Sequence, residues 1–419
     1  MKSMKTTLLA LSLFVLANSP AFAATDSAYI TQAGTNGSVT TTQTETAGSP
    51  NTITVNQNAG SFDETATVTQ AGGGNNSATV TQSGESDEAT VSQFGTSGTA
   101  TVTQSVGNNG ATVIQEAGST SATATIVQNG GGNIGNVYQT GTTDTATVDQ
   151  TGTNNTAVVG QNVASTLASA LVTQNGVSNG GTVSQEGLSG NATIDQVSGG
   201  NPVWNAATIN QNAFSENETA TINQNGNESF GLITQSGTFD TATINQTAEK
   251  NRATITQAGA GSNTATVNQN FDDSIANTAS ISQDGLSNDA TLTQSGNSND
   301  DLTVVQNGEG NAVSFTQSGN LNDADITQTG NSNVATLLEQ SGSSNDLTVE
   351  QRGDSSTIEV TESGDTNTAS ISQTGDFHSA KLVQSGNGNT ATVGQSGATA
   401  KLAELTQSGS GNTTTVTQN

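Results

Sequence analysis

The stretch Asn76-Ser77-Ala78-Thr79-Val80-Thr81-Gln82, followed by Ser83-Gly84-Glu85-Ser86, decides the fold of this chain. Small, apolar and amide residues alternate strictly with Ser and Thr over 76–82. A period of two is typical of a β-strand with one buried face, and β-branched residues suit a pleated surface. We therefore expect a strand over 76–82 whose Asn, Ala, Val and Gln side chains point inward.

The same frame recurs along the chain, for example at 251–257 and 389–395, and its final Gln returns about every eleven residues. The series runs from Gln32 to Gln418, and only Glu362 replaces a glutamine in it. A fixed short period indicates a stack of similar units, none of which buries its own core alone. The glutamines expected to form inward ladders that support folding and assembly include Gln70, Gln82, Gln93, Gln104, Gln115, Gln150, Gln185, Gln257, Gln294, Gln317, Gln373, Gln395 and Gln418.

A longer period lies within the shorter one. From Asn109 onward, every second strand begins mostly with Asn, whereas the strands between begin with residues such as Gly98, Ala122 and Asp144. The unit is therefore about 22 residues long and holds two strands of different type. The expected Asn ladder comprises Asn109, Asn133, Asn155, Asn179, Asn251, Asn277, Asn322, Asn345, Asn367, Asn389 and Asn412.

Glycine often occupies the second position after the ladder Gln, where the chain must turn a tight corner. Such a corner needs a positive φ, which Gly adopts without steric cost, and insertions are expected to fall in the same corners. The expected corner glycines are Gly84, Gly95, Gly141, Gly187, Gly296 and Gly375.

Two strands and two corners close one coil, and stacked coils place each strand on its counterpart about 22 residues earlier. The expected fold is all-β, a β-solenoid of about 17 two-strand coils in parallel, in-register cross-β stacking. It should span 24–419, with irregular first coils over 24–60. Stacked identical amides would hydrogen-bond along the axis.

Residues 1–23 have the pattern of a secretory signal peptide. Lys2 and Lys5 precede an apolar run from Leu8 to Leu16, and Ala21-Phe22-Ala23 is a cleavage site. The apolar run is too short for a membrane span. We expect an exported mature chain beginning at Ala24, without membrane insertion.

The composition of the chain excludes several classes of partner and of chemistry. The net charge is −28, with 7 Lys and Arg against 35 Asp and Glu, so nucleic acid is a poor partner. The chain has no Cys, which excludes thiol chemistry. His378 is its single His, so a pair of catalytic imidazoles and a metal site with several His ligands are excluded as well. We find no nucleophile–base pair, phosphate loop or metal cluster, and therefore expect neither an enzyme nor a cofactor.

The end coils are the weak points of a solenoid, because stability comes from stacking on both faces of each coil. The sequence shows no capping segment. Strand 412–418 is a full unit, and the pattern starts at Ala28-Tyr29-Ile30-Thr31-Gln32. Open strand edges would template another copy, so a self-assembling fibre is expected.

The repeat resembles the curlin repeat of bacterial curli fibres, which has two Gln-ended strands, a Gly after each Gln and Asn-x-Ala opening the second strand. Residues 384–395, Gln-Ser-Gly-Asn-Gly-Asn-Thr-Ala-Thr-Val-Gly-Gln, carry the match well. The resemblance implies a secreted functional amyloid, a fimbrium or pilus on a Gram-negative cell surface, which serves adhesion to abiotic or host surfaces and biofilm matrix. It also implies two partners, a nucleator subunit and an outer-membrane secretion pore.

The chain departs from the family pattern in three ways. It is much longer than the usual major subunit, it has no Gly/Asn-rich segment after the signal peptide, and it has no basic final repeat. A major and a nucleating role therefore both stay open.

Four other interpretations remain. The Asn and Gln rows could be low-complexity disorder. Outward Thr pairs such as Thr79 and Thr81 could form an ice-binding array on a monomeric solenoid, or the solenoid could be an adhesin shaft. Carboxylates expected in the corners could bind Ca²⁺, although solvated charge is the stronger expectation; they are Asp87, Glu88, Asp272, Asp273, Asp300 and Asp301.

Overall fold

The computed structural model describes residues 26–44, 49–199, 204–213, 215–270, 276–296 and 300–419. These residues form strands, turns and bends without a helix, so no helix in this part of the chain could span a membrane. The chain divides into two compact units, 1–150 and 151–419. The predicted signal peptide lies outside the described residues.

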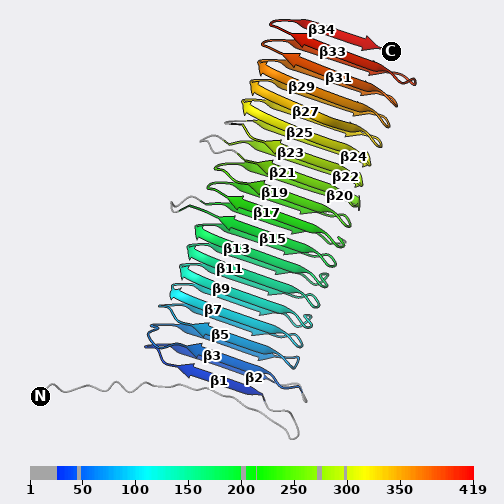
Figure 1. Cartoon of the computed structure of the whole chain (residues 1–419). Coiled ribbons are helices and arrows are strands. Elements are labelled where there is room, and N and C mark those ends of the chain that lie inside the picture. The colour runs from blue at the N-terminus through cyan, green and yellow to red at the C-terminus, as the bar shows by residue number, and fades with distance from the viewer. Residues whose placement is uncertain (1–25, 45–48, 200–203, 214, 271–275, 297–299) are drawn as a thin grey trace, which may run out of the picture. The chain divides into compact units, whose positions relative to one another are not determined.

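In the first unit, odd-numbered strands pair only with odd-numbered strands, and even-numbered strands only with even-numbered ones (Figure 1). Every pairing is parallel. Ser77 of one coil lies beside Thr99 of the next, and Gln82 beside Gln104. The strands are β1 (Ser27–Gln32), β2 (Ser38–Thr44), β3 (Thr52–Gln57), β4 (Thr65–Ala71), β5 (Ser77–Gln82), β6 (Glu88–Gln93), β7 (Thr99–Gly107), β8 (Gly110–Gln115), β9 (Thr123–Gly131), β10 (Ile134–Gln139) and β11 (Thr145–Thr153), which crosses the division.

The second unit repeats this arrangement, with two stacks of parallel strands in register. Gln224 lies beside Gln246, and Gln373 beside Gln395. Its first strands are β12 (Thr156–Gln161), β13 (Ser169–Val177), β14 (Gly180–Gln185), β15 (Asn191–Val197), β16 (Ala206–Gln211), β17 (Thr219–Asn225), β18 (Phe230–Gln235), β19 (Thr241–Gln246), β20 (Arg252–Gly261), β21 (Thr264–Gln269), β22 (Thr278–Leu286) and β23 (Asp289–Gln294).

The remaining strands of the second unit continue the same two stacks, so the all-β solenoid with parallel, in-register strands is confirmed. They are β24 (Asp301–Glu309), β25 (Ala312–Asn320), β26 (Asp323–Thr329), β27 (Val334–Ser343), β28 (Asp346–Arg352), β29 (Thr357–Asp365), β30 (Thr368–Thr374), β31 (Ser379–Ser385), β32 (Thr390–Ser396), β33 (Leu402–Ser408) and β34 (Thr413–Gln418).

The core lies between the two stacks, where inward positions alternate with outward ones as the period of two requires. In β5, Ala78, Val80 and Gln82 are fully buried, while Thr79 and Thr81 are half-buried on the outward face. Most inward apolar residues are Ala, Val or Ile, which bury little area per coil. Each coil therefore depends on its neighbours for stability.

Insertions do not all fall in corners, contrary to the sequence expectation. β27 contains one residue more than its partners, and its register with β25 shifts between Val313 and Phe315. Its register with β29 shifts as well, between Ala335 and Glu339. The extra residue forms a β-bulge inside the strand, next to the buried ring of Phe315.

Candidate functional site: amide ladders and end strands

The inward glutamines form side-chain ladders within each unit. In the first unit, Gln82 Nε2 donates to Gln104 Oε1 at 3.0 Å, and Gln104 Nε2 donates to Gln128 Oε1 at 2.9 Å. In the second, Gln257 Nε2 donates to Gln283 Oε1 at 2.9 Å. Almost all the glutamines named from the sequence are buried, and Gln418, on the last strand, is partly exposed. Stacking at strand spacing thus satisfies buried amides that would otherwise be costly.

Each ladder amide also ties the two stacks together. Gln82 Nε2 donates its second hydrogen to the carbonyl of Thr65 at 2.9 Å, and Gln294 Nε2 donates to the carbonyl of Thr278 at 3.0 Å. Donor and acceptor lie about sixteen residues apart, on strands of opposite stacks. A glutamine therefore fixes both the spacing of coils and the closure of each coil.

The ladders have a direction. Nε2 of one coil donates to Oε1 of the coil that follows in sequence, as from Gln351 to Gln373 at 3.1 Å and from Gln373 to Gln395 at 2.8 Å. The first strands and the last strands consequently present different groups at their outer edges.

At the outer edge of β1 and β2, the Oε1 atoms of the first two ladder glutamines accept no hydrogen bond from another ladder amide in the described part of the chain. Gln32 Nε2 donates to Gln57 Oε1 at 2.8 Å and Gln43 Nε2 to Gln70 Oε1 at 3.0 Å, but among the described residues no side chain donates to either of their Oε1 atoms. At β34 the donor half is unused. Gln418 accepts from Gln395 at 2.9 Å, and its Nε2 reaches only the carbonyl of Leu402.

The strand-start asparagines form a second kind of ladder. Asn322 Oδ1 accepts the backbone N–H of Asn345 at 3.1 Å, and Asn322 Nδ2 donates to the carbonyls of Ser318 and Gly342, both at 3.2 Å. The side chain thereby holds a corner of its own coil and a corner of the next. An amide suits this position because it donates and accepts at once.

The Asn ladder differs from the sequence expectation in two respects. The other stack of the second unit has its own run, which the alternate-strand rule missed: Asn263, Asn288, Asn311 and Asn333. Asn263, Asn288 and Asn311 lie six residues before a ladder Gln, whereas Asn333 lies seven before Gln340 because β27 contains the extra residue. Conversely, Asn251 is buried, but neither side-chain atom has a hydrogen-bond partner. Asn367 and Asn389 bond as Asn322 does. Asn109 Nδ2 instead donates to Asp87 Oδ1 and to the carbonyl of Ser105, and Asn179 Nδ2 donates to Asn155 Oδ1. Asn412 is exposed.

Several carboxylates occupy the same strand-start positions. Asp87 and Asp300 are each 1% exposed, so the expectation that they are solvated corner charges is wrong. Asp300 Oδ1 accepts the backbone N–H of Asn322 at 2.8 Å, as an Asn would, but its Oδ2 has no partner. Glu88 and Asp301 are exposed as expected, and Asp272 and Asp273 lie outside the described residues.

Burial shifts the protonation of these carboxylates. Loss of hydration raises the pKa of Asp300 and of Asp240 to about 6, and that of Glu218 to about 8. Asp240 lies one coil beyond Glu218 in the same stack, and its charge raises the pKa of Glu218 further. No group of three or more His, Asp or Glu residues suited to a metal ion occurs in the described part of the chain.

The corner glycines are needed mainly because the backbone of a neighbouring coil approaches them too closely for a Cβ. Gly375 has φ +117°, as expected, but Gly84, Gly95, Gly187 and Gly296 do not have positive φ. The left-handed residue there is a later one, Ser86 after Gly84 (φ 58°) and Ser97 after Gly95 (φ 57°). A Cβ on Gly84 would lie 2.7 Å from the backbone N of Gly107, so only Gly fits. The carbonyl of Gly141 accepts from Thr120.

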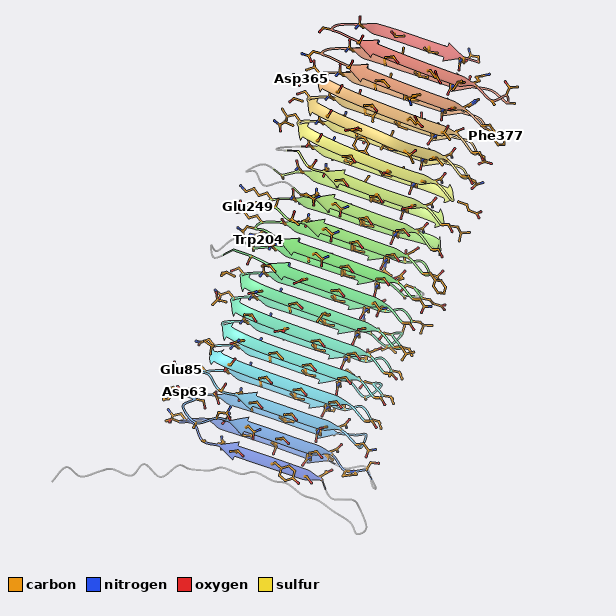
Figure 2. The ribbon with its side chains drawn as sticks, in the orientation of Figure 1. Asp63, Glu85, Trp204, Glu249, Asp365 and Phe377 are labelled. Atoms are coloured by element: carbon orange, nitrogen blue, oxygen red, sulfur yellow. The ribbon has the colours of Figure 1, made fainter. Side chains whose placement is uncertain are left out.

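Corner side chains point away from the coils. In the second unit, Glu249 and Asp365 lie along one row of corners, where the labelled Trp204 also stands, and Phe377 lies along the opposite row (Figure 2). Trp204 and Phe377 are 60% and 65% exposed. In the first unit, Asp63 and Glu85 share one row of corners. The interior is therefore occupied by amides and aliphatic groups, and most of the charge lies outside.

Six segments match the family model described as Curlin associated repeat: residues 73–105, 226–259, 275–300, 298–330, 319–353 and 364–397. The matches occur in both units. The chain belongs to the curlin repeat family. Curlin repeat proteins are structural rather than enzymatic, and the family implies an extracellular location. A comparison with curated proteins gave no match.

Proposed function

We propose that this curlin repeat protein is the structural subunit of a secreted, curli-like amyloid fibre, and that it polymerises head to tail. The observation that supports this most strongly is the direction of the glutamine ladders. Free acceptors stand at the outer edge of β1 and β2, and a free donor stands at β34. A second copy placed in register continues the ladder across the junction.

The apolar residues of the end strands fit the same register. Stacking β33 on β1 of the next copy sets Ala403 against Ala28, Leu405 against Ile30 and Gln407 against Gln32. Val416 and Ile30, which face inward, are partly exposed, whereas the equivalent positions in the interior coils are buried. Pairing would bury these side chains and join unpaired strand edges.

Further features of the proposal come from the family resemblance. The chain would leave the cell through an outer-membrane secretion pore of a Gram-negative bacterium, start polymerising on a nucleator subunit, and contribute to adhesion and biofilm matrix. The net charge of −28 makes neither nucleic acid nor an anionic membrane a favourable partner.

Paired substitutions at the donor end test the head-to-tail junction. Q407E/Q418E replaces amides by carboxyl groups, which at pH 7 must either take up a proton at the junction or face the acceptor oxygens of Gln32 and Gln43 as unpaired charges. T406E/T417E adds the same charge to the outward face of the same strands. Protonating a carboxyl of ordinary pKa at pH 7, or burying it as an unpaired charge, costs about 1.5–3 kcal/mol per rung.

Purified chains beginning at Ala24 are incubated at pH 7 and followed by thioflavin fluorescence and fibre diffraction. We expect wild type and T406E/T417E to form fibres with a 4.7–4.8 Å reflection, and Q407E/Q418E to elongate at least about tenfold more slowly. Equal rates for the two double variants would refute the junction. A persistent wild-type monomer with thermal hysteresis would instead support an ice-binding solenoid.

A further inference from the structure

Glu362 is the single carboxylate in the glutamine ladders. It lies on β29, fully buried, between Gln340 on β27 and Gln384 on β31. Gln340 Nε2 donates to Glu362 Oε2 at 2.9 Å, so the ladder reaches Glu362 in its usual direction. An ionised carboxylate only accepts hydrogen bonds, so ionised Glu362 has no hydrogen to donate to Gln384 in the next coil.

The amide of Gln384 can take two orientations beyond Glu362. In one, it keeps the common direction: Nε2 donates to Gln407 Oε1 at 2.8 Å and to the carbonyl of Thr368 at 3.4 Å. Its oxygen then faces Glu362 Oε1, and two acceptor oxygens are compatible there only if a proton lies between them. A protonated Glu362 supplies that proton.

In the other orientation, Gln384 turns its nitrogen toward Glu362 Oε1, at 2.7 Å, and its oxygen accepts from the backbone N of Ala391 at 3.3 Å. That oxygen would also face Gln407 Oε1 at 2.8 Å. Gln407 would then have to turn as well and lose the bonds from its Nε2 to the carbonyl of Thr390 and to Thr414 Oγ1. Ionised Glu362 thus reverses the ladder through the two coils that follow.

The charged groups around Glu362 favour the acid form. The carboxylate of Asp346, at the start of β28 in the opposite stack, acts on it directly. The other charged groups of the neighbouring strands lie on outward faces or at strand ends: Glu339 on β27, Glu359 and Asp365 on β29, Lys381 on β31, and Glu350 and Arg352 on β28. Lys381 pairs with Glu359 at 2.9 Å, and Arg352 pairs with Glu350. His378 immediately precedes β31, at the opposite end of that strand from Gln384.

We propose that Glu362 carries a proton in the folded solenoid and acts as a pH-sensitive rung, so that its ionisation loosens the coils around β27, β29 and β31. Burial, and to a lesser degree the charge of Asp346, raise its pKa to about 8. The bulge in β27 adjoins this rung, which places the weakened contact next to an already irregular strand.

The sign of the effect follows from proton uptake. The ordinary pKa of a Glu is 4.5 and the folded value is about 8, so the folded state binds one more proton than the unfolded state between these values. Stability is therefore fully present below about pH 4.5 and is lost as pH rises toward 8. One extra proton changes the opening equilibrium about tenfold per pH unit in this window.

Hydrogen exchange with peptide resolution tests the proposal on the full mature chain, in the same assembly state for every variant. Peptides covering 334–343, 357–365 and 379–385 are compared between wild type and E362Q at each pH from 5 to 9. E362Q restores the amide that every other rung carries. E359Q is the matched control, because Glu359 lies on the same strand but faces outward.

We expect the wild-type opening constant in these peptides to rise relative to E362Q by about tenfold per pH unit between pH 5 and 8, and to level off above. E359Q should follow wild type. An infrared difference spectrum at pH 7 should show a carboxylic-acid band in wild type that is lost in E362Q. A wild-type to E362Q ratio that does not change with pH, or the absence of that band, would overturn the proposal. Neither readout requires fibre growth, so this proposal and the proposed function fail separately.

Discussion

Replacing Asp300 by Asn should stabilise the second unit, and the gain should depend on pH. Asp300 stands in an Asn ladder between Asn277 and Asn322. Its Oδ1 accepts the backbone N–H of Asn322, as the Oδ1 of an Asn would, while its Oδ2 is buried without a hydrogen-bond partner. Asn at this position would supply an N–H in place of that oxygen. By the repeat, this N–H should reach the carbonyl of Gly319, as the Nδ2 of Asn277 reaches Gly296.

The size of the gain follows from the pKa of Asp300. Burial raises it from 3.8 to about 6, which corresponds to about 3 kcal/mol of lost stability once the pH exceeds 6. Because the folded value is the higher one, wild-type stability is fully present below pH 3.8 and declines as the pH rises to 6. D300N should therefore be more stable than wild type by about 3 kcal/mol at pH 7, and by about 1 kcal/mol or less at pH 3.5.

Urea unfolding at pH 3.5, 5 and 7, with hydrogen exchange in β22, β24 and β26, measures this difference. D301N is the matched control, because Asp301 is the next residue and is exposed. Its effect should stay within about 0.5 kcal/mol at all three pH values. A D300N gain that is equal at pH 3.5 and pH 7, or that D301N reproduces, would refute the argument that the unpaired buried oxygen destabilises the ladder.

Three further outcomes are expected. G342A should lower the stability by more than about 2 kcal/mol, because Gly342 has φ +107° and a Cβ there would collide with the carbonyl of Gly364. G180A should change the stability little, because a Cβ at Gly180 would have no close neighbour. Thermal unfolding of both variants measures the difference. E218Q should stabilise the coils of β17 and β19 increasingly as pH rises from 4.5 to about 8, measured by hydrogen exchange against the exposed control E216Q. Fibre elongation at pH 7 should accelerate between 10 and 150 mM NaCl, because added salt shortens the Debye length from about 30 to 8 Å and screens repulsion between chains of charge −28; rates independent of salt would contradict this.

The strand pattern could be predicted because it depends on local alternation. Asn76 to Gln82 already specifies which side chains face inward, and the repeat period predicts the register of the coils outside the bulge in β27 and the shift at the end of β20. The roles of corner residues could not be predicted in the same way. The sequence predicts a positive φ at Gly84, whereas in the structure Gly is required there because the backbone N of Gly107, in the next coil of the same stack, leaves no room for a Cβ.

Burial of the strand-start carboxylates was missed for a related reason. Asp87 and Asp300 each follow a short polar segment that begins with a Gly, Gly84 and Gly296, and their residue type is typical of a solvated turn. Their position six residues before a ladder Gln is the same as that of Asn109 and Asn322, and this places them inside. The signal was present in the spacing, and residue type alone gave the opposite expectation.

The ladders also suggest why a curlin repeat chain retains acids in its interior. A ladder Gln donates to the next coil and accepts from the coil before it, whereas a strand-start Asn accepts the backbone N–H of the next coil and donates to a carbonyl in that coil's corner, so each amide presents the next coil with the groups that it needs. A carboxylate at either kind of position accepts hydrogen bonds but can donate one only when it is protonated. Glu218, Asp240, Asp300 and Glu362 therefore divide the second unit into segments whose coupling depends on pH. Mild acid strengthens the contact at each of these rungs and reduces the overall negative charge, so both effects favour the folded solenoid in the same direction.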